Sequence, residues 1–193
     1  MVSLENVFPA RKRYLRNALM PSHMPNIAYN VSQKKKRISS AVSILSIFLV
    51  LLIDQVSKAA ISSKLYVGQS IPIIKNILHI TFVKNTGAAF GVFKNSAYFF
   101  IVVSIIAVVI IGAILVKAIR NGKFMDNFLC NFGLIFIISG ALGNLIDRVN
   151  LQYVIDFIDV RIWPVFNIAD SSITIGTALL IISFSKFDKN LNV

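Results

Sequence analysis

The chain has 193 residues, of which 56% are hydrophobic and 15% are charged. Soluble globular proteins contain about 45–50% apolar and about 25% charged residues, so this composition excludes an ordinary soluble domain and predicts a membrane protein. The net charge of +12 would suggest nucleic-acid binding if it lay on a soluble face. Here the basic residues cluster outside the apolar runs, so we expect no nucleic-acid partner.

Four apolar stretches approach the roughly 20 residues that a helix needs to cross a bilayer. They cover about residues 38–61, 97–119, 126–149 and 167–184. We therefore predict an all-α membrane protein with four transmembrane helices. Its membrane domain would span residues 38–186, and residues 187–193 would form a short tail. The basic leader, residues 1–37, is predicted to be largely disordered.

The loop between the first two apolar stretches, residues 62–96, has a different composition. Its segment 71–84 is rich in β-branched residues, contains Pro72 and is followed by a glycine-containing turn. This pattern favours short strands rather than a helix. We expect a small extracytoplasmic β platform that lies on the outer membrane surface.

Lysine and arginine predict the orientation. Of the 20 such residues, eight lie in the leader, three lie at or just after the end of the second stretch (Lys117, Arg120 and Lys123), and two follow the fourth stretch (Lys186 and Lys189). A four-span arrangement puts all of these on one side. The positive-inside rule therefore places both termini in the cytoplasm.

Four aspartates lie within or beside the apolar stretches: Asp54, Asp147, Asp156 and Asp170. An ionisable residue near a bilayer core costs roughly 2.5–3.5 kcal/mol on insertion scales, so its presence needs a functional reason. With both termini inside, all four arrive near the outer boundary. Two acidic side chains at one membrane depth are the minimum for acid–base hydrolysis of a peptide bond. The sequence therefore predicts a membrane-embedded aspartyl enzyme with its active site near the outer face.

The spacing of the polar residues indicates how they assist one another. Asp54 and Lys58 are four residues apart, on one helical face, and can form an ion pair. Asn144 and Arg148 have the same spacing, which puts an amide and a guanidinium on one stripe. Asp147 lies beside them as a partner for Arg148 or for a lysine.

The two remaining aspartates are predicted to have different surroundings. Asn167 is the predicted N-cap of the fourth helix, which would place Asp170 at the third helical position, where the helix dipole favours the ionised form. Asp156 would lie in a loop pressed against lipid, where desolvation favours the neutral form. Two carboxylates that differ in this way suit a shared-proton pair. Which of them is the general base stays open.

Each feature also has another interpretation. Asp54 with Lys58 would serve as an interfacial salt bridge, Arg148 would extend its charge to the membrane surface, and Asp170 would act as a helix cap. An ion or proton transporter would use Asp54, Asp147 and Asp170 as a relay. A relay should place carboxylates along the full bilayer depth, whereas these gather at one boundary. We therefore favour the peptidase.

Five short segments support this interpretation. They are DQVSK at 54–58, NTGAAFGVF at 85–93, GALGNLIDRV at 140–149, VIDFIDV at 154–160 and FNIADS at 166–171. At these residues the chain resembles the lipoprotein signal peptidases, also called signal peptidase II, while residues 1–37 have no counterpart in that family. The resemblance implies a multi-pass aspartic endopeptidase of the bacterial cytoplasmic (inner) membrane. It would remove the signal peptide from diacylglyceryl-modified prolipoproteins by cutting just before the lipid-modified cysteine.

The resemblance also assigns residues and partners. The family's catalytic aspartates fall on Asp156 and Asp170, and its other functional polar positions fall on Asp54, Lys58, Asn85, Asn144 and Arg148. No metal or organic cofactor is implied, and the partners would be the prolipoprotein substrate and membrane lipid. The oligomeric state stays open, with a monomer favoured. A non-catalytic anchor for lipoproteins is a further alternative, and only loss of chemistry in variants of the two aspartates separates it from an enzyme.

Overall fold

Helices make up most of the computed structural model, which describes residues 24–87, 97–121 and 128–189. The helices are α2 (Met24–Lys64), α3 (Ala97–Arg120), α4 (Phe128–Leu151) and α5 (Ile168–Lys189). All four are long and apolar enough to cross a membrane, which confirms the four predicted spans. In lipid a helix satisfies its own backbone hydrogen bonds, so apolar runs of this length form helices.

The start of the first helix differs from the prediction. Helix α2 begins at Met24, so the expectation that residues 24–37 lack regular structure is wrong, while residues 1–23 lie outside the described residues. Pro25 is at the second position of the helix, where its missing N–H costs nothing, and no Gly or Pro follows before the apolar stretch. Extending a helix that the apolar stretch has already nucleated is much easier than starting one.

Helices α4 and α5 pack against each other through glycines. A Cβ atom on Gly133 would lie 2.8 Å from the Gly176 carbonyl oxygen, and one on Gly140 would clash with the Ala169 carbonyl oxygen. Small residues of this kind let helix backbones approach closely in membranes. The outward faces of the helices carry exposed apolar side chains, among them Phe48, Val109 and Ile181. These faces suit contact with lipid.

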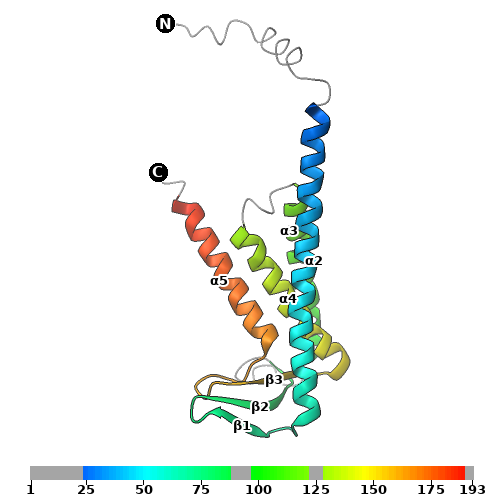
Figure 1. Cartoon of the computed structure of the whole chain (residues 1–193). Helices are drawn as coiled ribbons and strands as arrows, with labels where there is room; N and C mark the ends of the chain where they lie inside the picture. The colour runs from blue at the N-terminus through cyan, green and yellow to red at the C-terminus, as the bar shows by residue number, and fades with distance from the viewer. Residues whose placement is uncertain (1–23, 88–96, 122–127, 190–193) are drawn as a thin grey trace, which may run out of the picture.

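A three-stranded antiparallel sheet lies across one end of the helices (Figure 1). Its strands are β1 (Ser70–Ile74), β2 (Leu78–Asn85) and β3 (Val154–Asp159), in the order β1-β2-β3. The hairpin of β1 and β2 confirms the strands predicted in residues 62–96. Pro72 is tolerated because β1 is an edge strand.

Strand β3 was not predicted, because Asp156 was expected in a loop. The strand pairs with β2 so that Val83 lies opposite Asp156 and Asn85 lies opposite Val154. Phe82, Ile155 and Phe157 are buried together between the sheet and the helix ends. This small core fixes the sheet against the helices, and the pairing brings Asp156 beside Asn85.

We predict that Gly140→Ala destabilises the protein, because its methyl group would meet the Ala169 carbonyl and Ile173. Overpacking of this kind costs about 1–3 kcal/mol, so the thermal midpoint in detergent should fall by several degrees. Gly112→Ala is the matched control. A Cβ atom there meets only Ile138 Cδ1, at an ordinary 3.5 Å. Equal midpoints for the two variants would contradict the close packing of α4 on α5.

Candidate active site

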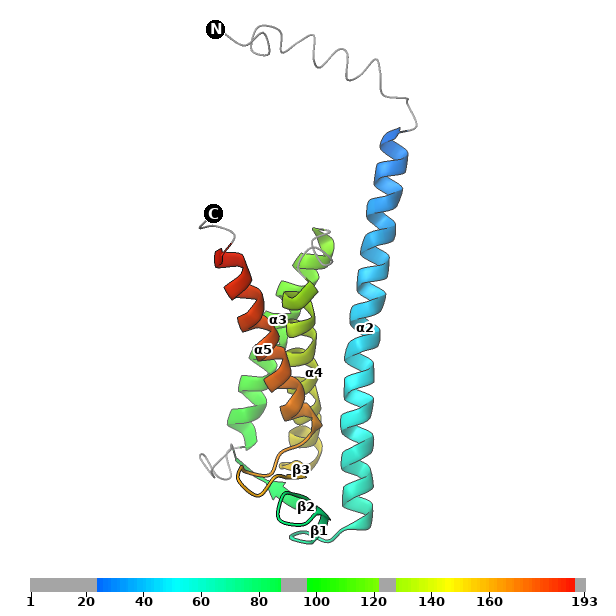
Figure 2. The ribbon, with the colours of Figure 1, turned by 60° about the vertical axis from the view of Figure 1, so that its left-hand side comes forward.

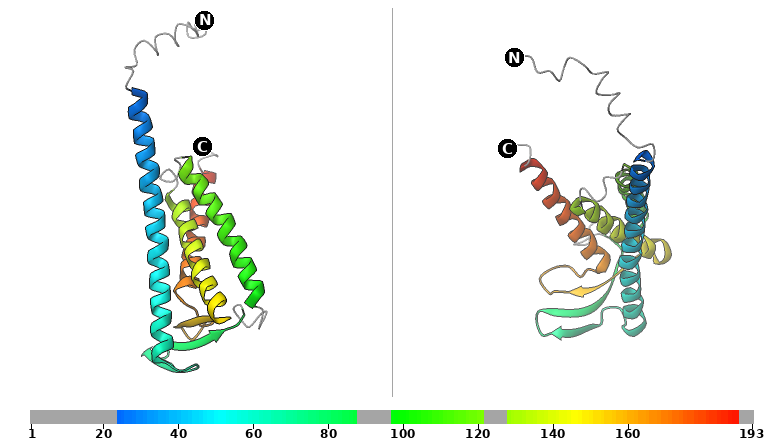
Figure 3. Two further views of the ribbon diagram at one scale, coloured as in Figure 1. Left: turned by 90° about the vertical axis from the view of Figure 1, so that its right-hand side faces the viewer. Right: turned by 45° about the horizontal axis from the view of Figure 1, so that its top comes forward.

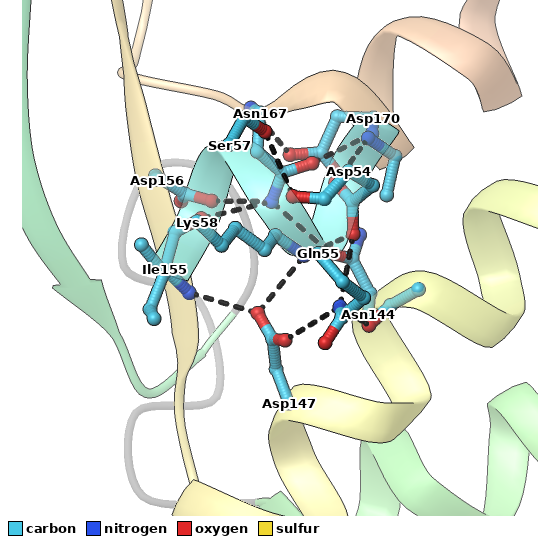
Figure 4. A network of polar contacts seen from close by, with 12 residues as sticks. Asp54, Gln55, Ser57, Lys58, Asn144, Asp147, Ile155, Asp156, Asn167 and Asp170 are labelled. Atoms are coloured by element: carbon cyan, nitrogen blue, oxygen red, sulfur yellow. Dashed lines mark hydrogen bonds and ion pairs between the residues drawn. The ribbon is translucent and has the colours of Figure 1, made fainter. Parts of the chain in front are cut away.

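A buried group of three charged side chains joins α2 to α4 at the sheet end of the molecule; we call it the ion cluster (Figure 4). Lys58 Nζ lies 2.8 Å from Asp54 Oδ2 and 2.9 Å from Asp147 Oδ2. The three side chains are only 1–3% exposed. This confirms the predicted pair of Asp54 with Lys58. It also shows that Asp147 binds this lysine.

The carboxylates of the ion cluster also bind the backbones of two other elements. Asp54 Oδ1 accepts a hydrogen bond from the Ala169 N–H, in the first turn of α5, at 2.9 Å. Asp147 Oδ2 accepts one from the Ile155 N–H of β3, at 3.1 Å. Gln55 donates to both carboxylates. Helices α2, α4 and α5 and strand β3 are therefore held by one set of charges.

Lys58 also orients the side chain of Asn144. Its ammonium group donates to Asn144 Oδ1 at 3.1 Å, and an ammonium group can only donate. The amide nitrogen of Asn144 must then point the other way, where it donates to Asp170 Oδ1 at 2.7 Å. The buried lysine thus determines that Asn144 is a hydrogen-bond donor to Asp170.

Asn167 caps α5 and links the two predicted catalytic residues. Its Oδ1 accepts from the Asp170 N–H at 2.8 Å, and its own N–H lies 3.3 Å from Asp170 Oδ2. This arrangement is a capping box, which confirms the predicted N-cap. Its Nδ2 donates to Asp156 Oδ1 at 2.8 Å and lies 3.0 Å from Asn144 Oδ1. The capping residue therefore connects Asp156 to Asp170 through hydrogen bonds (Figure 4).

Asn85 contacts Asp156 from the opposite side. Its Oδ1 accepts the Gly87 N–H at 3.0 Å, so its Nδ2 is the donor to Asp156 Oδ2, at 2.8 Å. Both oxygens of Asp156 therefore accept hydrogen bonds from side-chain amides. Adjacent strands supply these two residues, so their contact depends on the β2–β3 pairing.

The pKa of Asp156 is raised to about 7. Burial is the largest cause, and the negative charge of Asp170 adds to it. Hydrogen bonds from Asn85 and Asn167 and the positive charge of Lys58 act in the opposite direction but are outweighed. A carboxyl group with this pKa can hold or release a proton near neutral pH.

The two aspartates line one cavity of about 700 Å³, and three more of the predicted residues, Asn85, Asn144 and Arg148, line it with them. Its apolar wall comes from α3, α4, α5 and the segment after β3. That wall includes Phe100, Val103, Ala107, Ile137, Ala141, Trp163, Val165, Phe166 and Ile173. The Arg148 guanidinium lies over the Phe100 ring, 4.9 Å from its centroid. A mostly apolar cavity with a few convergent polar groups is typical of a ligand site.

The seven predicted residues thus divide into two groups. Five line the cavity, whereas Asp54 and Lys58 lie behind it in the ion cluster. From the sequence, Asn167 was expected only to cap the fourth helix, and no role was expected for Gln55. Two sequence features could have indicated these roles: Asn167 lies three residues before Asp170, and Gln55 carries a side-chain amide next to Asp54. In the ranges 24–87, 97–121 and 128–189, no group of three His, Cys, Asp or Glu side chains is placed to hold a metal ion.

We predict that Lys58→Met strongly destabilises the protein, because it leaves two buried carboxylates without a counter-ion. Breaking a buried ion pair in this way costs about 3–5 kcal/mol. Lys64→Met is the matched control, since Lys64 is exposed in the last turn of the same helix. Thermal unfolding of both variants in detergent measures the difference. A Lys58→Met midpoint equal to that of Lys64→Met would show that the ion cluster does not stabilise the fold.

Comparison with known proteins shows where this chain belongs. Residues 46–186 match the family described as signal peptidase (SPase) II. The lipoprotein signal peptidase of Halothermothrix orenii is 46% identical over 136 residues, which cover 70% of this chain and 90% of that protein. That of Clostridioides difficile is 45% identical over 141 residues, covering 72% and 91%.

Two solved structures are similar in fold. Both are described as a bacterial membrane enzyme determined by the in meso method. One superposes with a TM-score of 0.71 at 37% identity and covers 78% of this chain and 91% of its own. The other has a TM-score of 0.64 at 38% identity and covers 75% and 92%. The chain therefore belongs to the signal peptidase II family of membrane peptidases.

Proposed function

We propose that this chain removes the signal peptide from diacylglyceryl-modified prolipoproteins by cutting just before the lipid-modified cysteine, with Asp156 and Asp170 as the catalytic pair. The observation that supports this most directly is the convergence of the two carboxyl groups on one cavity. They come from β3 and α5 and share the hydrogen-bonding residue Asn167. Membership of the signal peptidase II family supports the same activity.

In the proposed reaction the pair holds one proton. Asp156, whose pKa is about 7, carries it, and Asp170 is the carboxylate that accepts N–H donors from Asn144 and Asn167. A water molecule between them attacks the scissile carbonyl carbon and loses a proton to Asp170. Asp156 gives its proton to the amide nitrogen as the C–N bond breaks. The products are the signal-peptide carboxyl group and the amine of the lipid-modified cysteine.

The other cavity residues would hold the substrate. The apolar wall suits acyl chains and the small or apolar residues of a signal peptide. The Arg148 guanidinium, held over Phe100, would donate to a peptide carbonyl or to the lipid ester region. Anchoring the substrate by its lipid would keep the scissile bond at a fixed depth, where the two aspartates lie.

We further propose that both termini lie in the cytoplasm and that the sheet and the cavity lie at the outer face. Arg37 of α2 and Lys117 and Arg120 of α3 lie toward the end of the helices opposite the sheet. The positive-inside rule assigns that end to the cytoplasm. The sheet would then rest at the outer surface, where prolipoproteins present their modified cysteine.

Proton transport is the weaker candidate. The buried charged side chains of the described part of the chain are Asp54, Lys58, Asp147, Asp156 and Asp159, and all belong to the sheet end. A proton relay needs titratable groups through the full thickness of the membrane. The gathering of these charges at one boundary therefore supports hydrolysis over transport.

We predict that Asp156→Asn and Asp170→Asn each reduce cleavage of a diacylglyceryl-modified prolipoprotein by about 10²–10⁴-fold, because each removes one proton-transfer group. Asp159→Asn is the matched control. It lies on the same strand as Asp156 but binds Thr81 and Arg161, outside the cavity lining. Purified variants with wild-type thermal midpoints should be compared, with an unlipidated substrate alongside. Full activity in either folded catalytic variant would contradict the assignment of the pair. If the protein were only an anchor for lipoproteins, the wild type itself would show no cleavage.

The pKa of Asp156 predicts the alkaline side of the pH profile. Because the proposed acid must be protonated, kcat/KM should fall about tenfold per pH unit once the pH exceeds about 7. Cleavage of a fluorogenic lipopeptide from about pH 5 to about pH 9 measures this limb. The Asp159→Asn variant should show the same fall in kcat/KM above about pH 7. A profile that stays flat well above pH 7 would mean that Asp156 is not the acid.

A further inference from the structure

Helix α2 is much longer than a membrane is thick. Its 41 residues, Met24–Lys64, extend about 60 Å at 1.5 Å per residue, twice the roughly 30 Å of a bilayer's hydrocarbon core. Its N-terminal part runs past the ends of α3, α4 and α5 (Figure 2; Figure 3, left). The match to the signal peptidase II family begins only at residue 46. This extension is therefore not covered by the family match and needs its own explanation.

Four consecutive basic residues, Lys34, Lys35, Lys36 and Arg37, lie on this extension. Helical residues are separated by about 100° around the axis, so these four side chains leave the helix in four directions. We call them the basic collar. Lys34 and Arg37 are exposed, whereas Lys35 and Lys36 are partly exposed. The sequence has no acidic residue from Met24 to Ile53. The helix therefore carries a ring of positive charge rather than a charged stripe.

The position of the basic collar along the helix places it at a membrane boundary. Arg37 precedes Asp54 of the ion cluster by 17 residues, or about 26 Å of helix. The residues between them carry no charge, and Ile44 and Phe48 are exposed, as expected for a surface that faces lipid. The collar and the ion cluster are therefore separated by roughly one hydrocarbon thickness. The collar lies at the boundary opposite the sheet.

Other basic residues add to the charge at this end. Lys117 and Arg120 lie in the last turn of α3 and are exposed. Helix α3 runs away from the sheet, so its last turn lies toward the same boundary (Figure 3, left). The positive charge at this boundary thus comes from two helices. On α2 it extends around the helix, whereas α3 contributes two residues.

We propose that the basic collar binds the headgroups of anionic phospholipids in the leaflet opposite the sheet. Clusters of four or more Lys and Arg directly beside a transmembrane helix attract anionic lipid surfaces. A protein partner docks against one side of a helix, so it would leave several of the four side chains unused. Lipid headgroups surround the helix and can meet all four. The direction of the charges therefore favours a lipid partner.

The test measures lipid selectivity in the full chain, with a readout separate from cleavage. Wild-type protein is reconstituted in phosphatidylcholine bilayers with trace spin-labelled phosphatidylglycerol or spin-labelled phosphatidylcholine. The motionally restricted fraction of each is measured by electron paramagnetic resonance. We expect the association constant for phosphatidylglycerol to exceed that for phosphatidylcholine by at least about fivefold, which corresponds to one cation near an anionic surface. The preference should weaken as salt is added.

Two variants separate charge from shape. K34Q/K35Q/K36Q/R37Q removes the charges but keeps long, helix-forming side chains, and it should lose most of the preference. K34R/K35R/K36R retains the charges and should keep it. K64Q/K75Q, which removes two cations from the sheet end, is the matched control and should also keep it. Unchanged prolipoprotein cleavage in the same vesicles confirms that each variant is folded and inserted.

Three results would overturn the proposal. The glutamine variant could retain the wild-type preference, or the arginine variant could lose it as fully as the glutamine variant does. The wild type could also show no preference between the two lipids. That last result would point to a protein partner for the extension.

Discussion

Lys58 and the two carboxylates that surround it determine how the polar end of this molecule is built. An ammonium group that is 2% exposed is tolerated only because Asp54 and Asp147 lie within 2.9 Å of it. Each carboxylate then binds a backbone N–H of another element, one in α5 and one in β3. The elements that carry Asp170 and Asp156 are therefore positioned by charges that do not line the cavity.

Lys58 also belongs to a hydrogen-bond network in which the donor and the acceptor of each bond are determined. Groups that can only donate, namely the Lys58 ammonium and the N–H groups of Asp170 and Gly87, occupy the oxygens of three asparagine amides. The NH₂ groups of these asparagines, Asn144, Asn167 and Asn85, must then point toward the two aspartates. Buried polar groups are costly unless they are hydrogen-bonded, and here the network that satisfies them also orients the two aspartates that we propose as the catalytic pair.

Glycines, which have no side chain, matter to this arrangement as much as the charged residues do. A Cβ atom on Gly143 would lie 2.6 Å from Asp54 Oδ2, so this glycine leaves the space that the carboxylate occupies. Gly140, one turn earlier, lets α4 approach the start of α5. The first turn of α5 can then reach both the ion cluster and Asn144. Close helix packing is therefore part of the site and not only a source of stability.

The sequence by itself determined the four spans, because apolar length and composition are local properties. It also determined the pair of Asp54 with Lys58 and the cap at Asn167, which depend on spacings of a few residues. It did not reveal β3, whose partner β2 lies about 70 residues earlier, nor the second bond of Lys58 to Asp147 on another helix. The contacts of Asn167 with Asp156 and of Asn85 with Asp156 likewise exist only after the sheet has formed. Tertiary structure decided which polar residues line the cavity and which lie behind it, because those contacts join residues that are distant along the chain.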